Sequence, residues 1–418
     1  MQPGFAETVR TFAKIGLLSF GGPAGQIATM HRILVDEKKW LDEERFLHAL
    51  NFCMLLPGPE AQQLATYAGW LLHRVKGGLA AGILFVAPGF VVMMALAAFY
   101  VGFRDLTVVQ GLFAGLKPAV LAVVVEACLR IGKRGLKRPG HRAVALLSFV
   151  AIFLFGLPFP LIVAAAGLYG FASTTAEGQQ ALVDRPGVGR SLPTILLWSA
   201  LWLAPVGLAL AWGQGAFGAV GLFFAKMAVV TFGGAYSVLA YVAQQAVEVH
   251  GWLTPPEMLD GLGLAETTPG PLILVNQFVG FLAGFRDPGP LNPWAGGVLA
   301  ASLTVWVTFV PSFLWIFAGA PHVERMRGNA RLAAALSAIT AAVFGVILNL
   351  SLWFALHVAF TKVGAWGVGP INLPLPDPAT AQPVAIALGA AAMVGLLRFK
   401  WGMVPVLAGS AVIGALLY

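Results

Sequence analysis

The chain has 418 residues, of which 58% are hydrophobic and 11% carry a charged side chain. This charged fraction is about half that of a typical soluble domain, and the mean hydropathy is +0.82. The composition excludes a water-soluble fold and predicts an all-α polytopic membrane protein, because a helix satisfies its backbone hydrogen bonds within hydrocarbon. The net charge of +8 indicates membrane orientation and not nucleic-acid binding, since no basic stretch alternates with stacking aromatic residues.

An internal repeat organises the chain. One constant shift, the first repeat offset, places Trp40 on Trp252 and makes three tripeptides coincide. These are Phe12-Ala13-Lys14 with Phe224-Ala225-Lys226, Phe20-Gly21-Gly22 with Phe232-Gly233-Gly234, and Pro57-Gly58-Pro59 with Pro269-Gly270-Pro271. Apolar composition does not supply Gly, Pro, Trp and Lys, so the match indicates a duplication.

After an insertion at 286–292 the match resumes more weakly at a slightly longer shift. This second repeat offset places Pro88 and Phe90 on Pro311 and Phe313. We predict one repeat over 1–172, a linker with an extra transmembrane helix over 173–213, and a second repeat over 214–418.

In the first repeat, the segments 8–33 and 46–72 each contain a predicted helix break. Phe-Gly-Gly and Pro-Gly-Pro do not favour a continuing helix, because glycine costs about 1 kcal/mol relative to alanine and proline removes a backbone donor. Arms of about 11 to 13 residues reach the middle of a bilayer. We therefore predict two re-entrant helix-break-helix hairpins, with two kinked crossings as the alternative interpretation.

The loop charges predict that the two repeats have opposite orientations. The segment 130–142 holds six basic residues, whereas its counterpart 361–382 holds only Lys362. The bias reverses at the preceding pair of loops, where the first copy has only Arg104. Because Lys and Arg concentrate on the cytoplasmic side, the repeats are predicted to be inverted, and one extra crossing at 192–212 accounts for the inversion.

Four helix breaks in two inverted copies predict one polar site near the membrane midplane. Unpaired backbone is too costly in hydrocarbon unless it is buried in protein or lines a polar cavity. Helices that begin after the breaks would present free N–H groups and the positive ends of their dipoles, which favours an anion. The preceding arms end at the same place and would attract cations, so an anion site needs a second source of positive charge.

Lysines within apolar segments are the predicted source of that charge. Lys14 and Lys226 each lie six residues before a Phe-Gly-Gly, and Lys117 beside Pro118 is a weaker candidate. A lysine at this depth is costly unless it faces a cavity, and the alternative is that it snorkels from a helix end. The predicted substrate-binding residues comprise the lysines, the breaks and nearby polar side chains: Lys14, Phe20, Gly21, Gly22, Pro57, Gly58, Pro59, Gln62, Gln63, Lys117, Lys226, Phe232, Gly233, Gly234, Thr267, Thr268, Pro269, Gly270, Pro271, Asn276 and Gln277.

Two carboxylates near the breaks are candidates for binding a coupling proton. Glu266 lies three residues before Pro269, and no structural role evident from the sequence explains a carboxylate there, so it is the first candidate. Glu60 is the second, because a carboxylate directly after Pro59 is also expected at a helix N-terminus. A third acid, Glu126, lies four residues before Arg130, and a helical salt bridge explains it.

Sequence signatures of enzymes are absent. The chain has no HExxH, CxxC, GxSxG or P-loop motif, and no two of its seven histidines lie within four residues of each other. We therefore predict no enzymatic activity, no cofactor and no metal site. A passive anion channel and a membrane enzyme with dispersed catalytic residues remain as alternatives. Cys53 and Cys128 are expected to be buried free thiols.

Several of these motifs together resemble the chromate ion transporter family in its long, two-domain form. The residues that carry the resemblance are Phe20-Gly21-Gly22, the segment from Leu56 to Tyr67, Gly69-Trp70, Lys117-Pro118-Ala119-Val120, and Glu266 to Pro271. The resemblance implies a multi-pass carrier of the inner membrane that exports chromate, confers chromate resistance and is driven by the proton-motive force.

The resemblance leaves three points open. Sulfate has the same tetrahedral shape and charge as chromate, so it is an alternative substrate or a competitor. The transport direction is not readable from the residues, and a homodimer in the lipid bilayer stays open. The flanks of the two Pro-Gly-Pro motifs differ, since Glu60 matches Leu272 and Gln62-Gln63 match Leu274-Val275. An asymmetric site is therefore expected.

Overall fold

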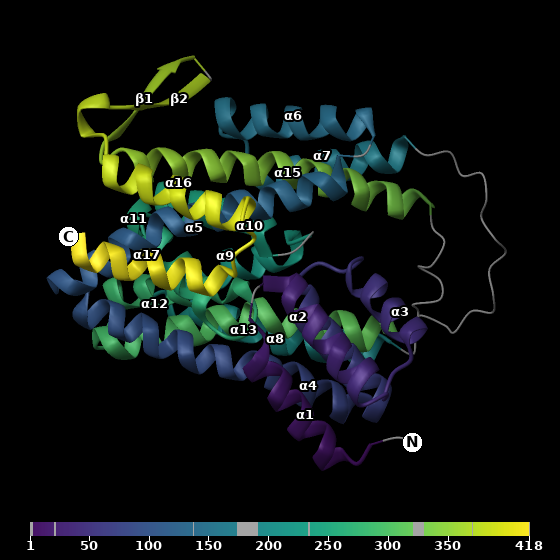
Figure 1. Ribbon diagram of the computed structural model, residues 1–418. Helices are drawn as coiled ribbons and strands as arrows, with labels where there is room; N and C mark the ends of the chain where they lie inside the picture. Colours follow the sequence, from purple (N-terminus) through teal and green to yellow (C-terminus); the bar gives the residue numbers. More distant parts are fainter. Residues whose placement is uncertain are drawn as a thin grey trace. The chain divides into compact units, whose positions relative to one another are not determined.

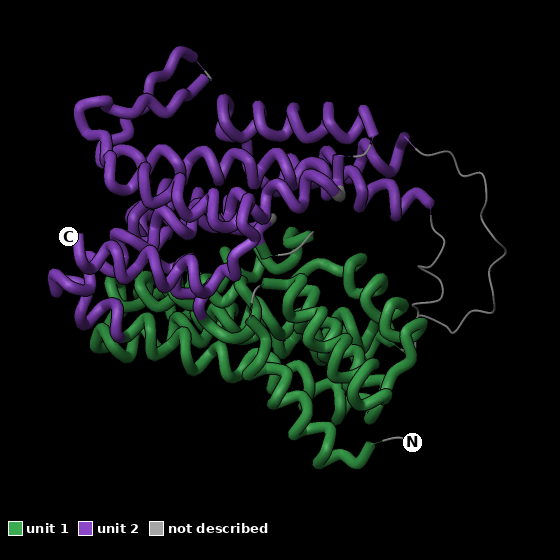
Figure 2. The backbone as a smooth tube through the Cα atoms, in the orientation of Figure 1, with its two compact units in different colours: residues 1–98, 177–235, 268–329 green, residues 99–176, 236–267, 330–418 purple. Residues whose placement is uncertain are grey.

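The computed structural model describes residues 3–20, 22–136, 138–173, 191–232, 235–320, 330–369 and 371–417 (Figure 1). Gly21, Gly233 and Gly234 of the predicted site lie outside these residues, as do most residues of 172–190 and 322–331. The chain divides into two compact units (Figure 2). Unit 1 comprises 1–98, 177–235 and 268–329, and unit 2 comprises 99–176, 236–267 and 330–418.

Unit 1 is a helical bundle that contains the described residues of the predicted breaks. Its elements are α1 (Phe5–Leu18), α2 (Gly22–His31), η1 (Arg32–Glu37), α3 (Glu43–Cys53), α4 (Glu60–Phe103, whose end belongs to unit 2), α8 (Leu192–Trp212), α9 (Phe217–Val230), η4 (Leu272–Leu274), α12 (Val275–Arg286) and α13 (Pro293–Gly319). Helix α13 packs against α8, α9 and α12.

Unit 2 is a second helical bundle with a small β-hairpin at one end. Its elements are α5 (Thr107–Gly135), α6 (Pro139–Phe155), α7 (Phe159–Ala172), α10 (Ala235–Ala243), η3 (Gln244–Val249), α11 (Pro255–Thr267), α15 (Ala330–Ala359), β1 (Val363–Val368), β2 (Ile371–Pro376), η6 (Pro378–Thr380), α16 (Pro383–Leu397) and α17 (Met403–Leu417). The strands pair antiparallel, with Val363 opposite Pro376.

The helices confirm the predicted class of an all-α polytopic membrane protein. Among the described residues, five helices are long and apolar enough to cross a membrane, namely α4, α5 over 107–133, α8, α13 and α15. Helix α4 is interrupted at His73 and Arg74, where φ of Arg74 is +53°. The chain folds back there, and a side chain on Gly69 would overlap the backbone of Gly77. The 44-residue helix is thus a short arm and a long arm joined by a sharp turn.

The sequence repeat is also a repeat of local structure. Helices α1 and α9 both have 14 residues, and their first residues, Phe5 and Phe217, match at the first repeat offset. The π-helical segments η1 and η3 begin at positions that match at the same offset. The starts of α5 and α15 match at the second repeat offset, the one that places Pro88 on Pro311.

In unit 2, the long helix of each half packs against the last two helices of the other half. Helix α5 contacts α16 and α17, and α15 contacts α6 and α7. A side chain on Gly414 of α17 would overlap the backbone of Gly111, while one on Gly170 of α7 would overlap that of Ala334 on α15. These two close contacts correspond to each other when the halves are exchanged.

Candidate functional site

The helix breaks of the two halves are joined by a reciprocal pair of hydrogen bonds in unit 1. The N–H of Gly58 donates to the carbonyl oxygen of Thr231 over 2.8 Å, and the N–H of Gly270 donates to that of Ser19 over 2.7 Å. The first repeat offset relates the two donors to each other, and it also relates the two acceptors. Each Pro-Gly-Pro turn therefore contacts the end of the helix that precedes the other half's Phe-Gly-Gly.

Local chemistry explains why the chain breaks at these positions. Gly58 and Gly270 have φ of +117° and +96°, a region that side chains disfavour. The hydroxyls of Ser19 and Thr231 are fully buried, and each donates 2.7 Å to the carbonyl oxygen four residues earlier. These bonds occupy carbonyl groups that the ended helices leave without partners.

Four amide side chains that the sequence predicted as ligands are buried beside these turns. Gln62 and Gln63 follow the first turn in α4, and Asn276 and Gln277 follow the second in α12; none is more than 1% exposed. Within the described part of the chain, no partner is found for either polar atom of Gln62 or for the side-chain oxygens of the other three. Buried polar groups are normally satisfied, so these atoms are candidates for binding a ligand.

The remaining polar atoms of these amides bind backbone and sulfur atoms. Gln63 Nε2 donates to the carbonyl oxygen of Pro57 over 2.7 Å, and Gln277 Nε2 donates to that of Phe90 over 2.9 Å. Asn276 Nδ2 lies 3.2 Å from the sulfur of Met227. These bonds fix the side chains in place and leave their oxygens free.

Sequence reasoning missed three further members of this group. Gln26 Nε2 donates to the carbonyl oxygen of Gly270 over 2.6 Å, and Thr308 and Ser312 lie on α13. All three are at most 1% exposed, and Gln26 Oε1 and both hydroxyls lack a partner among the residues described. A Cβ atom at Gly58 would lie 3.7 Å from Ser312 Oγ. The signal was present, because Ser312 belongs to the repeated Pro311–Phe313 motif.

Two predicted lysine ligands lie elsewhere. Lys14 on α1 and Lys226 on α9 are exposed, whereas the next residues, Ile15 and Met227, are fully buried. We call Gln26, Gln62, Gln63, Asn276 and Gln277 the buried amide cluster. Neither ammonium group belongs to it, and exposed positions also suit snorkelling lysines. Phe20 is 39% exposed and Phe232 is half-buried.

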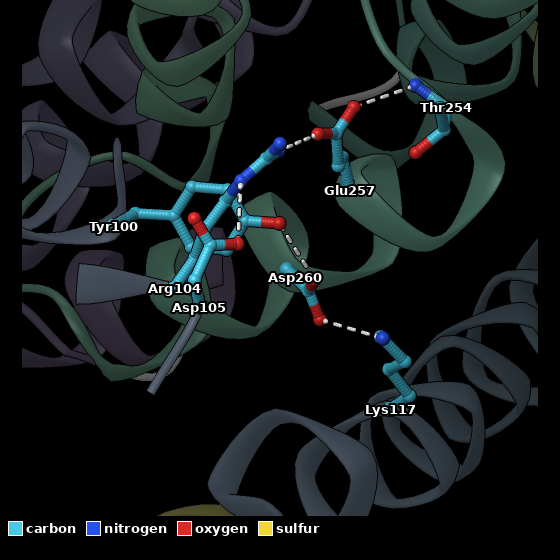
Figure 3. Close-up of polar contacts among 7 residues, drawn as sticks. All are labelled: Tyr100, Arg104, Asp105, Lys117, Thr254, Glu257 and Asp260. Carbon is cyan, nitrogen blue, oxygen red and sulfur yellow. Dashed lines mark hydrogen bonds and ion pairs between the residues drawn. The ribbon is translucent and has the colours of Figure 1, made fainter. Parts of the chain in front are cut away.

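Lys117 is paired with an acid that sequence reasoning did not single out. In unit 2, Lys117 Nζ lies 3.4 Å from Asp260 Oδ1, and Tyr100 Oη donates to Asp260 Oδ2 over 2.9 Å (Figure 3). Glu257, which lies on α11 as Asp260 does, forms a close ion pair with Arg104. Asp260 and Glu257 are acids three residues apart in a mostly apolar segment, which was the missed signal.

The carboxylates near the breaks have different surroundings. Glu266 is buried in unit 2 and accepts a 2.5 Å hydrogen bond from Tyr236 Oη. Glu60 begins α4 and is half-buried. Thr267 is exposed and its hydroxyl donates to backbone carbonyls of α11, whereas Thr268 is buried.

Two structural predictions are confirmed. Glu126 lies 3.4 Å from Arg130, as the helical spacing indicated. Cys53 and Cys128 are free and buried. In the described ranges, no group of three or more His, Cys, Asp or Glu residues is placed to hold a metal ion.

Together the fold and the site define a polytopic helical membrane protein with buried polar groups at broken helices. The chain belongs to the family described as "Chromate transporter", whose model matches residues 6–171 and 218–415. It is 34% identical over 351 residues to the chromate transport protein of Pseudomonas aeruginosa, covering 82% of this chain and 79% of that one. It is 26% identical over 408 residues to the chromate transport protein of Cupriavidus metallidurans, covering 94% and 93%.

A shorter relative matches part of this chain. The uncharacterized transporter YwrA of Bacillus subtilis is 28% identical over 157 residues, which are 37% of this chain and 88% of YwrA. No solved structure matches the chain.

Proposed function

We propose that the protein is a chromate carrier of the inner membrane that exports the anion from the cytoplasm and so confers chromate resistance. The observation that carries this proposal is the buried amide cluster around the two Pro-Gly-Pro turns in unit 1. The relatives whose names specify chromate support the choice of substrate.

The cluster suits a tetrahedral oxyanion. Each oxygen of a dianion accepts hydrogen bonds, and neutral donors can solvate it without a fixed counter-charge. An amide can present its NH₂ group by rotation, and the hydroxyls of Thr308 and Ser312 can donate as well. Backbone N–H groups at the starts of α2 and α4 add donors with a favourable dipole. A site of neutral donors binds the anion without trapping it in an ion pair.

We further propose that residues 1–172 and 214–418 are inverted repeats joined by 173–213. The opposite loop charges, the reciprocal hydrogen bonds and the exchanged packing of α5 and α15 support this interpretation. A relative of which 88% matches 157 residues of this chain supports the size of one repeat. Inverted repeats place a shared site near the midplane and allow it to open alternately to either side.

The proton-motive force is the proposed source of energy. Export of a dianion from a negative cytoplasm is favoured by about 4.6 kcal/mol per 100 mV, since each charge contributes about 2.3 kcal/mol. Coupling to protons in addition requires a titratable group, for which Glu266 is the first candidate and Glu60 the second. Glu266→Gln is expected to abolish the response of chromate transport to an imposed pH gradient.

Transport into reconstituted vesicles tests the proposal. Saturable chromate uptake with competition by sulfate supports an oxyanion carrier, and equal rates for the two anions would make it a general sulfate and chromate carrier. Uptake that does not saturate would instead indicate a passive channel, and chemical change of the anion would indicate an enzyme. A pH response that is unchanged in both Glu266→Gln and Glu60→Gln would remove these carboxylates from the coupling step.

A further inference from the structure

Asp260 is a buried carboxylate whose nearest cation is Lys117. The residue is 4% exposed, and its Oδ2 accepts the hydrogen bond from Tyr100. Its Oδ1 faces Lys117 Nζ at 3.4 Å and has no hydrogen bond from any residue that the structure describes (Figure 3). A buried carboxylate with one neutral donor depends on its cation to stay ionised.

The neighbouring acid Glu257 shows what a structural ion pair looks like on the same helix. One carboxylate oxygen binds Arg104, and the other accepts the N–H of Thr254 over 2.8 Å. Both oxygens of Glu257 are therefore used, and it closes the start of α11. The charge of Arg104 is taken by Glu257 and, at 3.8 Å, by Asp105, so Lys117 remains as the cation for Asp260.

The other helices around α11 offer few charges. Helices α15 and α17 also pack against it. The titratable residues of α15 are Arg331 and His357, near its two ends, and Met403–Leu417 of α17 contains none. On α5, the charged residues that follow Lys117 begin with Glu126 and Arg130, which pair with each other. The balance between Asp260 and Lys117 is thus a local property of this pair, with Tyr100 bonded to Asp260 and Glu257 one turn away on α11.

The duplication argues against a purely structural role for the pair. Asp260 corresponds to His48 at the first repeat offset, and Lys117 corresponds to Thr340 at the second. The two corresponding positions, His48 and Thr340, therefore hold neither a carboxylate nor a lysine. A charged pair that joins the two halves once, and is not repeated at the corresponding positions, points to a function that the duplicated fold needs only once.

We propose that Asp260 is a proton-binding site and that its protonation state controls whether the positive charge of Lys117 is compensated. When Asp260 is ionised, the two charges compensate each other. When Oδ1 takes up a proton from water, Lys117 becomes an uncompensated positive charge that favours a bound anion. By linkage, the anion raises the proton affinity of Asp260 by the same factor. This inference rests on the proposed oxyanion carrier, and it makes Asp260 the alternative to Glu266 and Glu60 as the group whose protonation is coupled to the anion.

Chromate binding to the purified protein across a pH series tests the inference. Asp260→Asn keeps an oxygen for Tyr100 and imitates the protonated state, so it is expected to bind chromate equally tightly at acidic and alkaline pH, relative to the free dianion. The wild type is expected to match this variant in acid and to bind more weakly as the pH rises, by roughly 5- to 150-fold, the usual range of coupling between two sites. Protonation of chromate itself affects both proteins equally, so the difference between the curves belongs to Asp260.

Three variants distinguish a proton-controlled charge from a purely structural ion pair. Lys117→Gln should bind chromate weakly at every pH. Adding Asp260→Asn to it should not change the affinity further, because the positive charge that Asp260 compensates is gone. Glu257→Gln is the matched control one turn away on α11. It should lower the unfolding temperature and leave the pH dependence of chromate affinity as in the wild type.

The results that overturn the inference are distinct from those that overturn the proposed function. Parallel pH curves for the wild type and Asp260→Asn would remove Asp260 as a proton site while leaving the carrier intact. If the wild type binds no chromate, both the proposed function and the role of Asp260 are wrong. Infrared difference spectra give a readout without any anion: the protonated-carboxyl band that grows on acidification is expected to be larger in the wild type than in the Asp260→Asn, Lys117→Gln double variant, by the contribution of one carboxyl group. Bands of equal size in the two proteins would refute the assignment.

Discussion

Replacing Gln62 with leucine should make the protein more stable and less able to bind chromate. Gln62 is the third residue of α4 and is fully buried. Neither polar atom of its amide has a partner in the described part of the chain. Leaving a buried polar group unsatisfied costs about 1 to 3 kcal/mol, and a leucine of similar size removes that cost. We expect the free energy of unfolding to rise by about 1 to 3 kcal/mol.

The effect on binding has the opposite sign. A hydrogen bond to a charged group contributes about 1.5 to 3 kcal/mol, which corresponds to a loss of roughly 10- to 150-fold in chromate affinity. Unfolding by denaturant in detergent gives the first quantity, and competition binding with chromate gives the second. Both are measured on the same preparation, so a poorly folded variant cannot imitate the expected result.

Gln63→Leu is the matched control. Gln63 donates to the carbonyl oxygen of Pro57, so its replacement leaves that carbonyl unpaired and should bring no gain in stability. If Gln62→Leu lowers stability and binds chromate normally, the Gln62 amide is satisfied in another way and does not contact the anion. The buried amide cluster would then not be the anion site.

Three further predictions concern packing, pH and topology. Gly414→Ala should destabilise the protein by about 1 to 3 kcal/mol, because the new methyl group would overlap the α5 backbone, whereas Gly409→Ala on the same helix, with no atom near its Cβ position, should be neutral in the same unfolding assay. The hydrogen bond to Glu43 raises the pKa of His31. The stability that this hydrogen bond contributes is therefore complete below about pH 6.5, the pKa of histidine in the unfolded chain, and is lost as the pH rises through the pKa of His31 in the folded protein. The difference in unfolding temperature between the wild type and His31→Gln should shrink over this pH range. Single cysteines at 135 and 367 should label from opposite faces of the membrane, and labelling from the same face would contradict the inverted repeats.

The sequence predicted the breaks and the amides because both depend on local chemistry. Phe-Gly-Gly and Pro-Gly-Pro disfavour a continuing helix, and α1, α3 and α11 end at or within a few residues of the motifs. The first repeat offset then predicted a corresponding helix break in the other half. The β-hairpin in the segment 361–382 was not predicted, since its strands are short and rich in Gly and Pro.

The partners of the charged residues could not be predicted in the same way. The repeat offsets relate equivalent positions, whereas an ion pair joins non-equivalent ones. Lys117 and Asp260 come from different halves, as do Arg104 and Glu257. Only the packing of α5 and the end of α4 against α11 brings them together, and no periodicity within one segment encodes that packing.

The two halves have divided the polar groups between them. Gln62 and Gln63 correspond to Leu274 and Val275 at the first repeat offset, while Asn276 and Gln277 correspond to Leu64 and Ala65. Each half therefore retains one pair of adjacent amides, shifted by two residues along its helix. A strictly symmetric site would present the same donors twice and would bind an anion equally well in either orientation. The shifted pairs instead give the two sides of the site different geometries, so the affinity for an anion can differ between its two orientations in the site.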